Sequence, residues 1–136
     1  MLCSFYCLCC HLNYGSIWDR GESSSLASSI RKNRNRTGAS VKQMEKKIMG
    51  RRGDILIRRL NTEYGCGEAG KLYDGPNGTK LLRERGLKTP KMMKDQFNIL
   101  CTLVESKKSK IRSLETIGFI HAGMLCVIYY FLNKIY

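Results

Sequence analysis

The stretch Asp54-Ile-Leu-Ile-Arg-Arg-Leu60, followed by Asn61-Thr62 and by Glu63-Tyr-Gly-Cys-Gly-Glu68, decides the fold. Its first segment is rich in aliphatic and β-branched residues, which favour a strand. A short polar turn and a returning segment then predict an antiparallel hairpin. Gly65 and Gly67 weaken a strand, so we expect a close backbone approach or a bulge at these two positions.

Helical patterns lie on both sides of this hairpin, which we place at about residues 53–69. Apolar residues at steps of three and four predict a helix over 40–49. A short helix is predicted over 79–86. Thr89-Pro90 puts a proline at the first position of a longer helix over 90–106, where its missing N–H is tolerated. A small sheet flanked by helices places the chain in the α+β class.

With 136 residues, 43% of them hydrophobic, the chain has room for one domain. We take residues 21–116 as a basic α+β core. Before it, residues 1–20 are an apolar, cysteine-rich leader that we expect to be poorly ordered. After it comes a hydrophobic segment, 117–136. The seven cysteines are odd in number and irregularly spaced, which indicates a reducing, intracellular location in the nucleus or cytoplasm, with a membrane as the alternative.

Two interpretations remain open for residues 117–132, which carry no formal charge. A tail anchor in a membrane is the first, because the basic residues just before the segment match a positive-inside flank. A core hairpin or helix is the second, and it is favoured because a membrane helix needs about 17 to 25 residues. His121 also counts against burial in lipid.

The chain carries a formal net charge of +13, which favours a polyanionic partner such as nucleic acid, or an anionic membrane surface. Four cations lie within the six residues 31–36. They are suited to phosphate contacts, and the alternative is a solvated linker. The candidate nucleic-acid-binding residues are Arg31, Lys32, Arg34, Arg36, Arg51 and Arg52.

Acidic residues are the main candidates for chemistry. Asp54 opens the first strand, Glu63 and Glu68 bracket the second, and Lys71 follows. If the acids converge at one end of the hairpin, they can bind Mg²⁺ through their oxygens, and a lysine can stabilise charge on a phosphate. Glu22, on a short helix expected over 22–30, would complete the site. The alternative is that the acids form solvated ion pairs with basic neighbours such as Arg51, Arg52, Arg58 and Lys80.

Several segments together resemble an uncharacterised group of fungal proteins that occur in many copies. The resemblance covers about residues 21–123, and no activity is attached to the group. The segments that carry it are Gly21-Glu-Ser-Ser-Ser25, Arg31-Lys-Asn-Arg-Asn-Arg36, Gly50-Arg-Arg-Gly-Asp-Ile-Leu56, Glu63-Tyr-Gly-Cys-Gly-Glu-Ala-Gly-Lys71, Gly78-Thr-Lys-Leu-Leu82 and Leu87-Lys-Thr-Pro-Lys-Met-Met-Lys-Asp95.

The order of the candidate residues is also similar to that of the PD-(D/E)XK nuclease superfamily. By position, this resemblance implies Glu22, Asp54, Glu68 and Lys71 as catalytic residues, with Asp54 and Glu68 as ligands of Mg²⁺. Glu68-Ala-Gly-Lys71 has one residue more than the Glu-x-Lys of the superfamily, which turns the lysine of a regular strand to the opposite face unless Gly70 hosts a bulge.

The implied function is a nucleic-acid-associated protein with a nuclease-like core, active or degenerate. A tail-anchored membrane protein with a basic cytosolic domain and a truncated, vestigial domain without activity are the alternatives.

Overall fold

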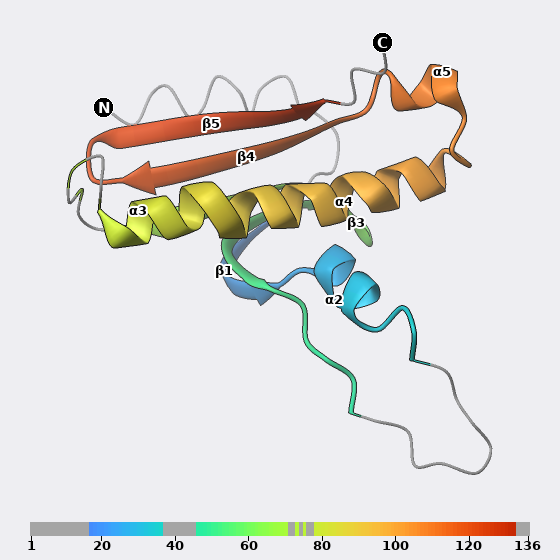
Figure 1. Ribbon diagram of the computed structural model, residues 1–136, viewed down its shortest axis with the longest axis horizontal. Coiled ribbons are helices and arrows are strands. Elements are labelled where there is room, and N and C mark those ends of the chain that lie inside the picture. Colours follow the sequence, from blue (N-terminus) through green and yellow to red (C-terminus); the bar gives the residue numbers. More distant parts are fainter. Residues whose placement is uncertain (1–16, 37–45, 71–72, 74, 76–77, 133–136) are drawn as a thin grey trace.

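The computed structural model describes residues 17–36, 46–70, 73, 75 and 78–132. They form an α+β fold with one five-stranded sheet in the order β1-β2-β3-β4-β5 (Figure 1). The elements in chain order are β1 Ile17–Ser24, α2 Leu26–Lys32, β2 Arg52–Arg59, β3 Thr62–Gly70, α3 Thr79–Arg83, a π-helical turn Glu84–Lys88, α4 Thr89–Leu103, α5 Lys108–Ile111, β4 Glu115–Ala122 and β5 Leu125–Leu132.

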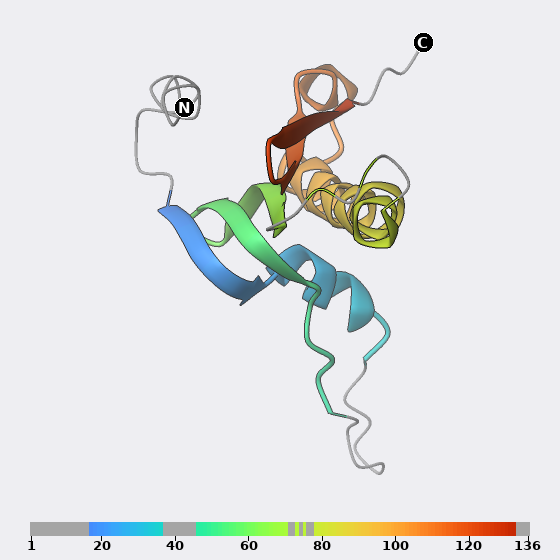
Figure 2. The same ribbon diagram turned by 90° about the vertical axis from the view of Figure 1, so that its left-hand side faces the viewer.

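The sheet is mixed. Strand β2 runs antiparallel to both β1 and β3, β4 runs parallel to β3, and β5 runs antiparallel to β4. A parallel neighbour requires a crossover, and α4 provides it. Figure 2 shows α4 end-on, with α2 on the same side of the sheet. This face of the sheet, called here the helix face, is therefore where side chains of distant segments meet.

The hairpin predicted from the sequence is confirmed as β2 and β3, although its turn lies at Leu60-Asn61 instead of Asn61-Thr62. The pairing shifts between Ile57↔Gly65 and Arg58↔Glu63, which leaves Tyr64 as the extra residue of a bulge. Because a bulge interrupts the alternation of sides, Glu63 turns to the helix face together with Cys66.

The predicted close approach at the two glycines is also confirmed. A Cβ at Gly67 would overlap the ring of Phe119, and a Cβ at Gly65 would overlap Ile117. Both neighbours belong to β4, the parallel partner of β3. The glycines thus allow bulky apolar side chains of β4 to lie over β3 on the face that α4 does not cover.

The core lies between α4 and the helix face. Its centre is formed by the buried side chains of Leu56, Cys66, Met92 and Met93. Near the middle of α4, Phe97 packs on Phe131 of β5, with 5.1 Å between ring centroids. The observed α4 agrees with the helix predicted over 90–106, and its proline lies in the first turn.

The other predicted helices need correction. Glu22 lies in β1 and not in a helix, because Ser25 caps the helix that begins at Leu26. Of the helix predicted over 40–49, residues 40–45 lie outside the described residues, and 46–49 have no regular structure. The helix predicted over 79–86 begins at Thr79 as expected but continues through the π-helical turn into α4.

The two ends of the chain differ from the expected leader and anchor. Residues 17–20 of the leader belong to β1, and residues 1–16 lie outside the described part. Residues 117–132 form most of the β4–β5 hairpin, with a turn at Gly123 (φ 58°), so the continuous helix expected for a tail anchor is wrong there. Within the described residues, no helix is long and apolar enough to cross a bilayer.

Candidate functional site

Asp54 and Glu68 meet on the helix face of the sheet. Ile55 pairs with Gly67, so the next positions outward, Asp54 and Glu68, are neighbours across β2 and β3. Each lies two residues beyond a core residue, Leu56 or Cys66, and therefore projects from the same side. The Asp54 carboxylate accepts a hydrogen bond from the backbone N–H of Ala69, at 2.7 Å from Oδ2. The register thus places the positions of the two acids side by side, as the convergence predicted for them requires.

A lysine from the helical layer completes this cluster. Lys88 Nζ lies 2.6 Å from Glu68 Oε2 and 3.7 Å from Glu84 Oε2. Both Lys88 and Glu84 belong to the π-helical turn that leads into α4. The site therefore consists of Asp54, Glu68, Glu84 and Lys88. Its positive charge is the ammonium group of Lys88, in the turn before α4.

Burial dominates the electrostatics of Glu68. It raises the pKa of this carboxyl from its usual value of 4.5 to about 7, the hydrogen bond from Lys88 opposes the rise, and the charges of Glu84 and Asp54 add to it. Burial also lowers the pKa of the Lys88 ammonium, but the hydrogen bond to Glu68 and the three nearby carboxylates outweigh this effect, so that the pKa is raised. Glu68 is therefore partly protonated at neutral pH, beside a charged lysine.

The same burial affects the neighbouring thiol. Cys66 is 1% exposed, and burial raises its pKa to about 12, with smaller contributions from Glu68 and Glu63. The thiol is thus a core side chain and not a nucleophile.

Some carboxylate oxygens of this site accept no hydrogen bond from the described residues. Among the described residues, buried Oε1 of Glu68 and Oε2 of Glu84 have no hydrogen-bond partner. Buried carboxylate oxygens without donors are suited to a hard cation. Within the same part of the chain, however, no group of three or more His, Cys, Asp or Glu side chains is arranged to hold a metal ion. Asp54 and Glu68 are therefore two candidate oxygen ligands on adjacent strands, without a third His, Cys, Asp or Glu placed among the described residues to hold a metal ion with them.

Two of the four predicted catalytic residues are not part of this cluster. Glu22 lies on β1, separated from β3 by β2, and its exposed carboxylate pairs with Arg52 at 3.5 Å. The expectation that Glu22 completes the site is therefore wrong, because the strand continues through it to Ser24. Lys71 lies outside the described residues.

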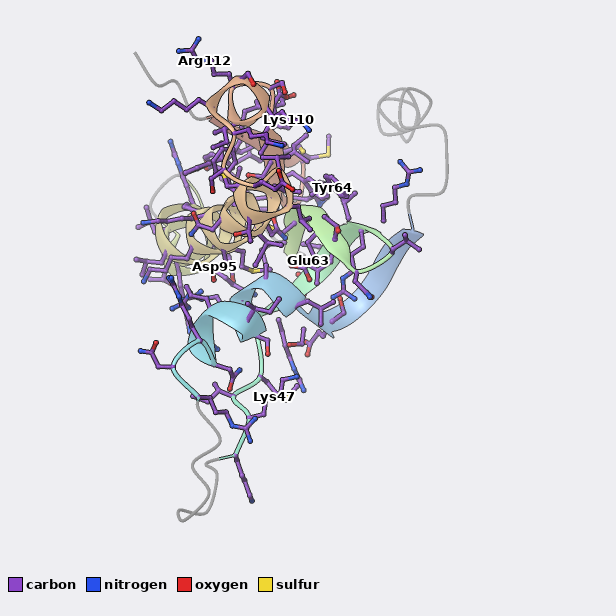
Figure 3. All side chains as sticks on the ribbon, turned by 90° about the vertical axis from the view of Figure 1, so that its right-hand side faces the viewer. Lys47, Glu63, Tyr64, Asp95, Lys110 and Arg112 are labelled. Atoms are coloured by element: carbon purple, nitrogen blue, oxygen red, sulfur yellow. The ribbon has the colours of Figure 1, made fainter. Side chains whose placement is uncertain are left out.

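Glu63, predicted to converge with the other acids, has a different role. Its carboxylate accepts hydrogen bonds from Ser25 Oγ and from the backbone N–H of Leu26, both at 2.6 Å, and lies 3.4 Å from Arg58 Nε. It therefore satisfies the N-terminal backbone of α2, on the part of β3 beyond the bulge (Figure 3). The convergence of Glu63 with Asp54 is wrong, because the bulge directs it toward α2.

Part of the predicted basic surface is engaged in holding the fold. Asp95 on α4 is 4% exposed and pairs with Arg31 at 2.7 Å and with Arg51 at 3.1 Å. Lys32 donates to the backbone carbonyl of Met49 at 2.8 Å. These contacts attach α2 and the segment before β2 to α4. Of the other candidates, Arg34, Arg36 and Arg52 are exposed.

Sequence reasoning missed Lys88 and Glu84. Thr89-Pro90 predicts the start of a helix, and Lys88 immediately precedes this start. The sequence did not predict that β4 runs parallel to β3. This parallel connection brings the start of α4 over the end of β3, where Glu68 lies.

Comparison of the chain with protein-family models, with curated protein sequences and with solved structures found no match.

Proposed function

We propose that this chain is a nucleic-acid-associated protein with a nuclease-like core, in which Asp54 and Glu68 bind Mg²⁺ at a phosphate of the nucleic acid. The observation that carries the proposal is the meeting of two acids on adjacent strands with Lys88 at 2.6 Å from Glu68. Two carboxylates can hold a cation at a phosphate, and a lysine can stabilise the negative charge that develops there. The net charge of +13 supports a polyanionic partner.

Each residue has a distinct task in this proposal. Asp54 and Glu68 supply oxygens to the cation, which when bound polarises a phosphate and activates water. Glu68 must release its proton first, and its pKa of about 7 makes this possible near neutral pH. Lys88 would then turn from Glu68 toward the phosphate, where it stabilises negative charge.

Binding of the polyanion relies on the exposed cations. Arg34 and Arg36 extend beyond α2, and Arg52 is exposed at the start of β2. Arg31 and Arg51 contribute their charge while they remain paired with Asp95. We therefore expect Arg34→Gln and Arg36→Gln to weaken DNA binding without unfolding, whereas Arg51→Gln also destabilises the fold.

The test uses the full chain with labelled DNA and RNA in the presence of Mg²⁺. We expect binding that weakens steeply with salt and cleavage that Asp54→Asn and Glu68→Gln abolish. The matched control is Glu115→Gln, an exposed acid of β4, which should leave cleavage unchanged. Cleavage undiminished in Asp54→Asn would contradict the catalytic part. Salt-sensitive binding without any cleavage would indicate a degenerate core, and absence of binding would overturn the proposal.

A further inference from the structure

The two edges of the sheet are built differently. β1, at one edge, contains the charged residues Asp19, Arg20 and Glu22, and its pairing with β2 is irregular between Arg20 and Ser23. Charges and bulges are the devices by which proteins keep an edge strand from pairing with another chain. The β1 edge therefore has protection against such pairing.

β5, at the other edge, has neither a charged residue nor an irregularity in its pairing. Its sequence Leu125-Cys-Val-Ile-Tyr-Tyr-Phe-Leu132 contains no charged residue and no proline. Its pairing with β4 is regular from Ala122↔Leu125 to Glu115↔Leu132. In the described part of the chain, no strand pairs with its outer edge, and β5 is the outermost strand in Figure 1. A regular, apolar strand of about 26 Å thus presents unpaired N–H and C=O groups.

The side chains of β5 reinforce this contrast. On the face that α4 does not cover, Ile128 is 45% exposed and Tyr130 is 57% exposed, with Cys126 also exposed beside them. On the helix face, Phe131 packs on Phe97. A strand added beside β5 would gain apolar neighbours on both faces.

We propose that β5 pairs with β5 of a second copy of this chain, antiparallel and about a two-fold axis, so that the two sheets become one. A strand that runs antiparallel to its own copy is self-complementary, which makes the pair closed and limits it to a dimer. Each copy carries +13, so a contact between two copies is least opposed where the touching surfaces themselves carry no charge. Among the five strands, β5 is the uncharged one. The two-fold would also bring exposed Ile128 and Tyr130 of both copies together, the type of cross-strand pair that stabilises a sheet.

The experiment measures the mass of the full chain by sedimentation equilibrium over a range of concentrations. We expect a dimer for the wild type. Ile128→Lys and Tyr130→Lys should raise its dissociation constant about tenfold or more, because like charges would oppose one another across the two-fold. The control is Met124→Lys, which adds the same charge at an 88% exposed position in the turn before β5 and should leave the dimer intact. Circular dichroism verifies that each variant is folded.

Amide hydrogen exchange supplies a second measurement that needs no variant. Exchange of residues 125–132 should slow as the wild-type concentration rises, while exchange of β1 stays constant. A monomer at all concentrations would overturn the proposal. So would a dimer that both lysine variants leave intact, a dimer whose exchange in β5 is independent of concentration, or an open series of larger assemblies.

Discussion

Glu63 and Glu68 are both buried on β3, at 2% and 4% exposure, yet their surroundings differ. Glu63 accepts from Ser25, Leu26 and Ala27, and lies beside Arg58. Glu68 has Lys88 on one oxygen, while its other oxygen has no hydrogen-bond partner among the described residues.

Burial alone therefore does not distinguish a structural acid from a candidate ligand. At Glu63 the carboxylate replaces the backbone acceptors that the first turn of α2 lacks, which stabilises the native fold. At Glu68 the same group is desolvated without full compensation, and its pKa rises to about 7. Such incomplete satisfaction is typical of functional sites.

The largest effect is expected at the satisfied acid. Glu63→Ala removes the acceptor of the first turn of α2 and the buried carboxylate that lies beside Arg58. We expect a loss of about 3–5 kcal/mol in the free energy of unfolding, as for other buried pairs from which one partner is removed. Urea denaturation measures it. Glu115→Ala, at an exposed position, should change stability by less than about 0.5 kcal/mol. Similar losses in both variants would contradict the capping role.

Glu68→Gln should affect the pH dependence of stability. The carboxyl keeps its proton up to about pH 7 when folded but releases it near pH 4.5 when unfolded, so its contribution to wild-type stability falls between these two values. In Glu68→Gln the neutral amide does not release a proton, so the stability of the variant does not fall in this way. Its stability relative to the wild type should therefore rise from pH 4.5 to pH 7, by up to about 3 kcal/mol. Denaturant titrations at several pH values measure the difference, and a difference independent of pH would contradict the raised pKa.

Lys88→Met should show how much the ammonium of Lys88 stabilises the fold when Glu68 is ionised and when it is protonated. Without the ammonium, an ionised Glu68 has no cation at hydrogen-bond distance, whereas a protonated Glu68 needs none. We expect a loss of about 2 kcal/mol at pH 8 and a smaller loss at pH 5. In the double variant with Glu68→Gln the dependence on pH should disappear. Equal losses at both pH values, measured by the same denaturant titrations, would indicate that only packing of the lysine stem is involved.

The smallest effect is expected at Glu22. Its ion pair with Arg52 is exposed on both sides, at 60% and 73%, and such pairs contribute little. Glu22→Gln should change the free energy of unfolding by less than about 0.5 kcal/mol and leave Mg²⁺-dependent cleavage unchanged. A cleavage assay with this variant beside Asp54→Asn decides whether Glu22 acts in the site, because a large loss would restore the role that its sequence position implied.

The elements predicted correctly are those that short stretches of sequence determine by themselves. The aliphatic run after Asp54, the turn and returning segment that follow it, and Pro90 identified β2, β3 and α4. β1 was missed because residues 1–20 were assigned to a poorly ordered leader and residues 22–30 to a short helix. The site was found in part: the acids on adjacent strands follow from hairpin pairing, but Lys88 reaches Glu68 only through the crossover to β4. The role of Glu63 was missed because the bulge at Tyr64, next to Gly65 where a bulge or a close approach was expected, reverses the side of the sheet to which Glu63 points.

The buried thiol of Cys66 makes opening of the core measurable through its rate of alkylation. At pH 8 a thiol with a pKa of about 12 holds almost no thiolate, and it lies beneath α4. We expect iodoacetamide to modify exposed Cys126 quickly and Cys66 only while the helix is lifted from the strand, so that the slow alkylation rate, followed by peptide mass spectrometry, reports how often the core opens. Equal rates at the two thiols would mean that the interior admits the reagent freely.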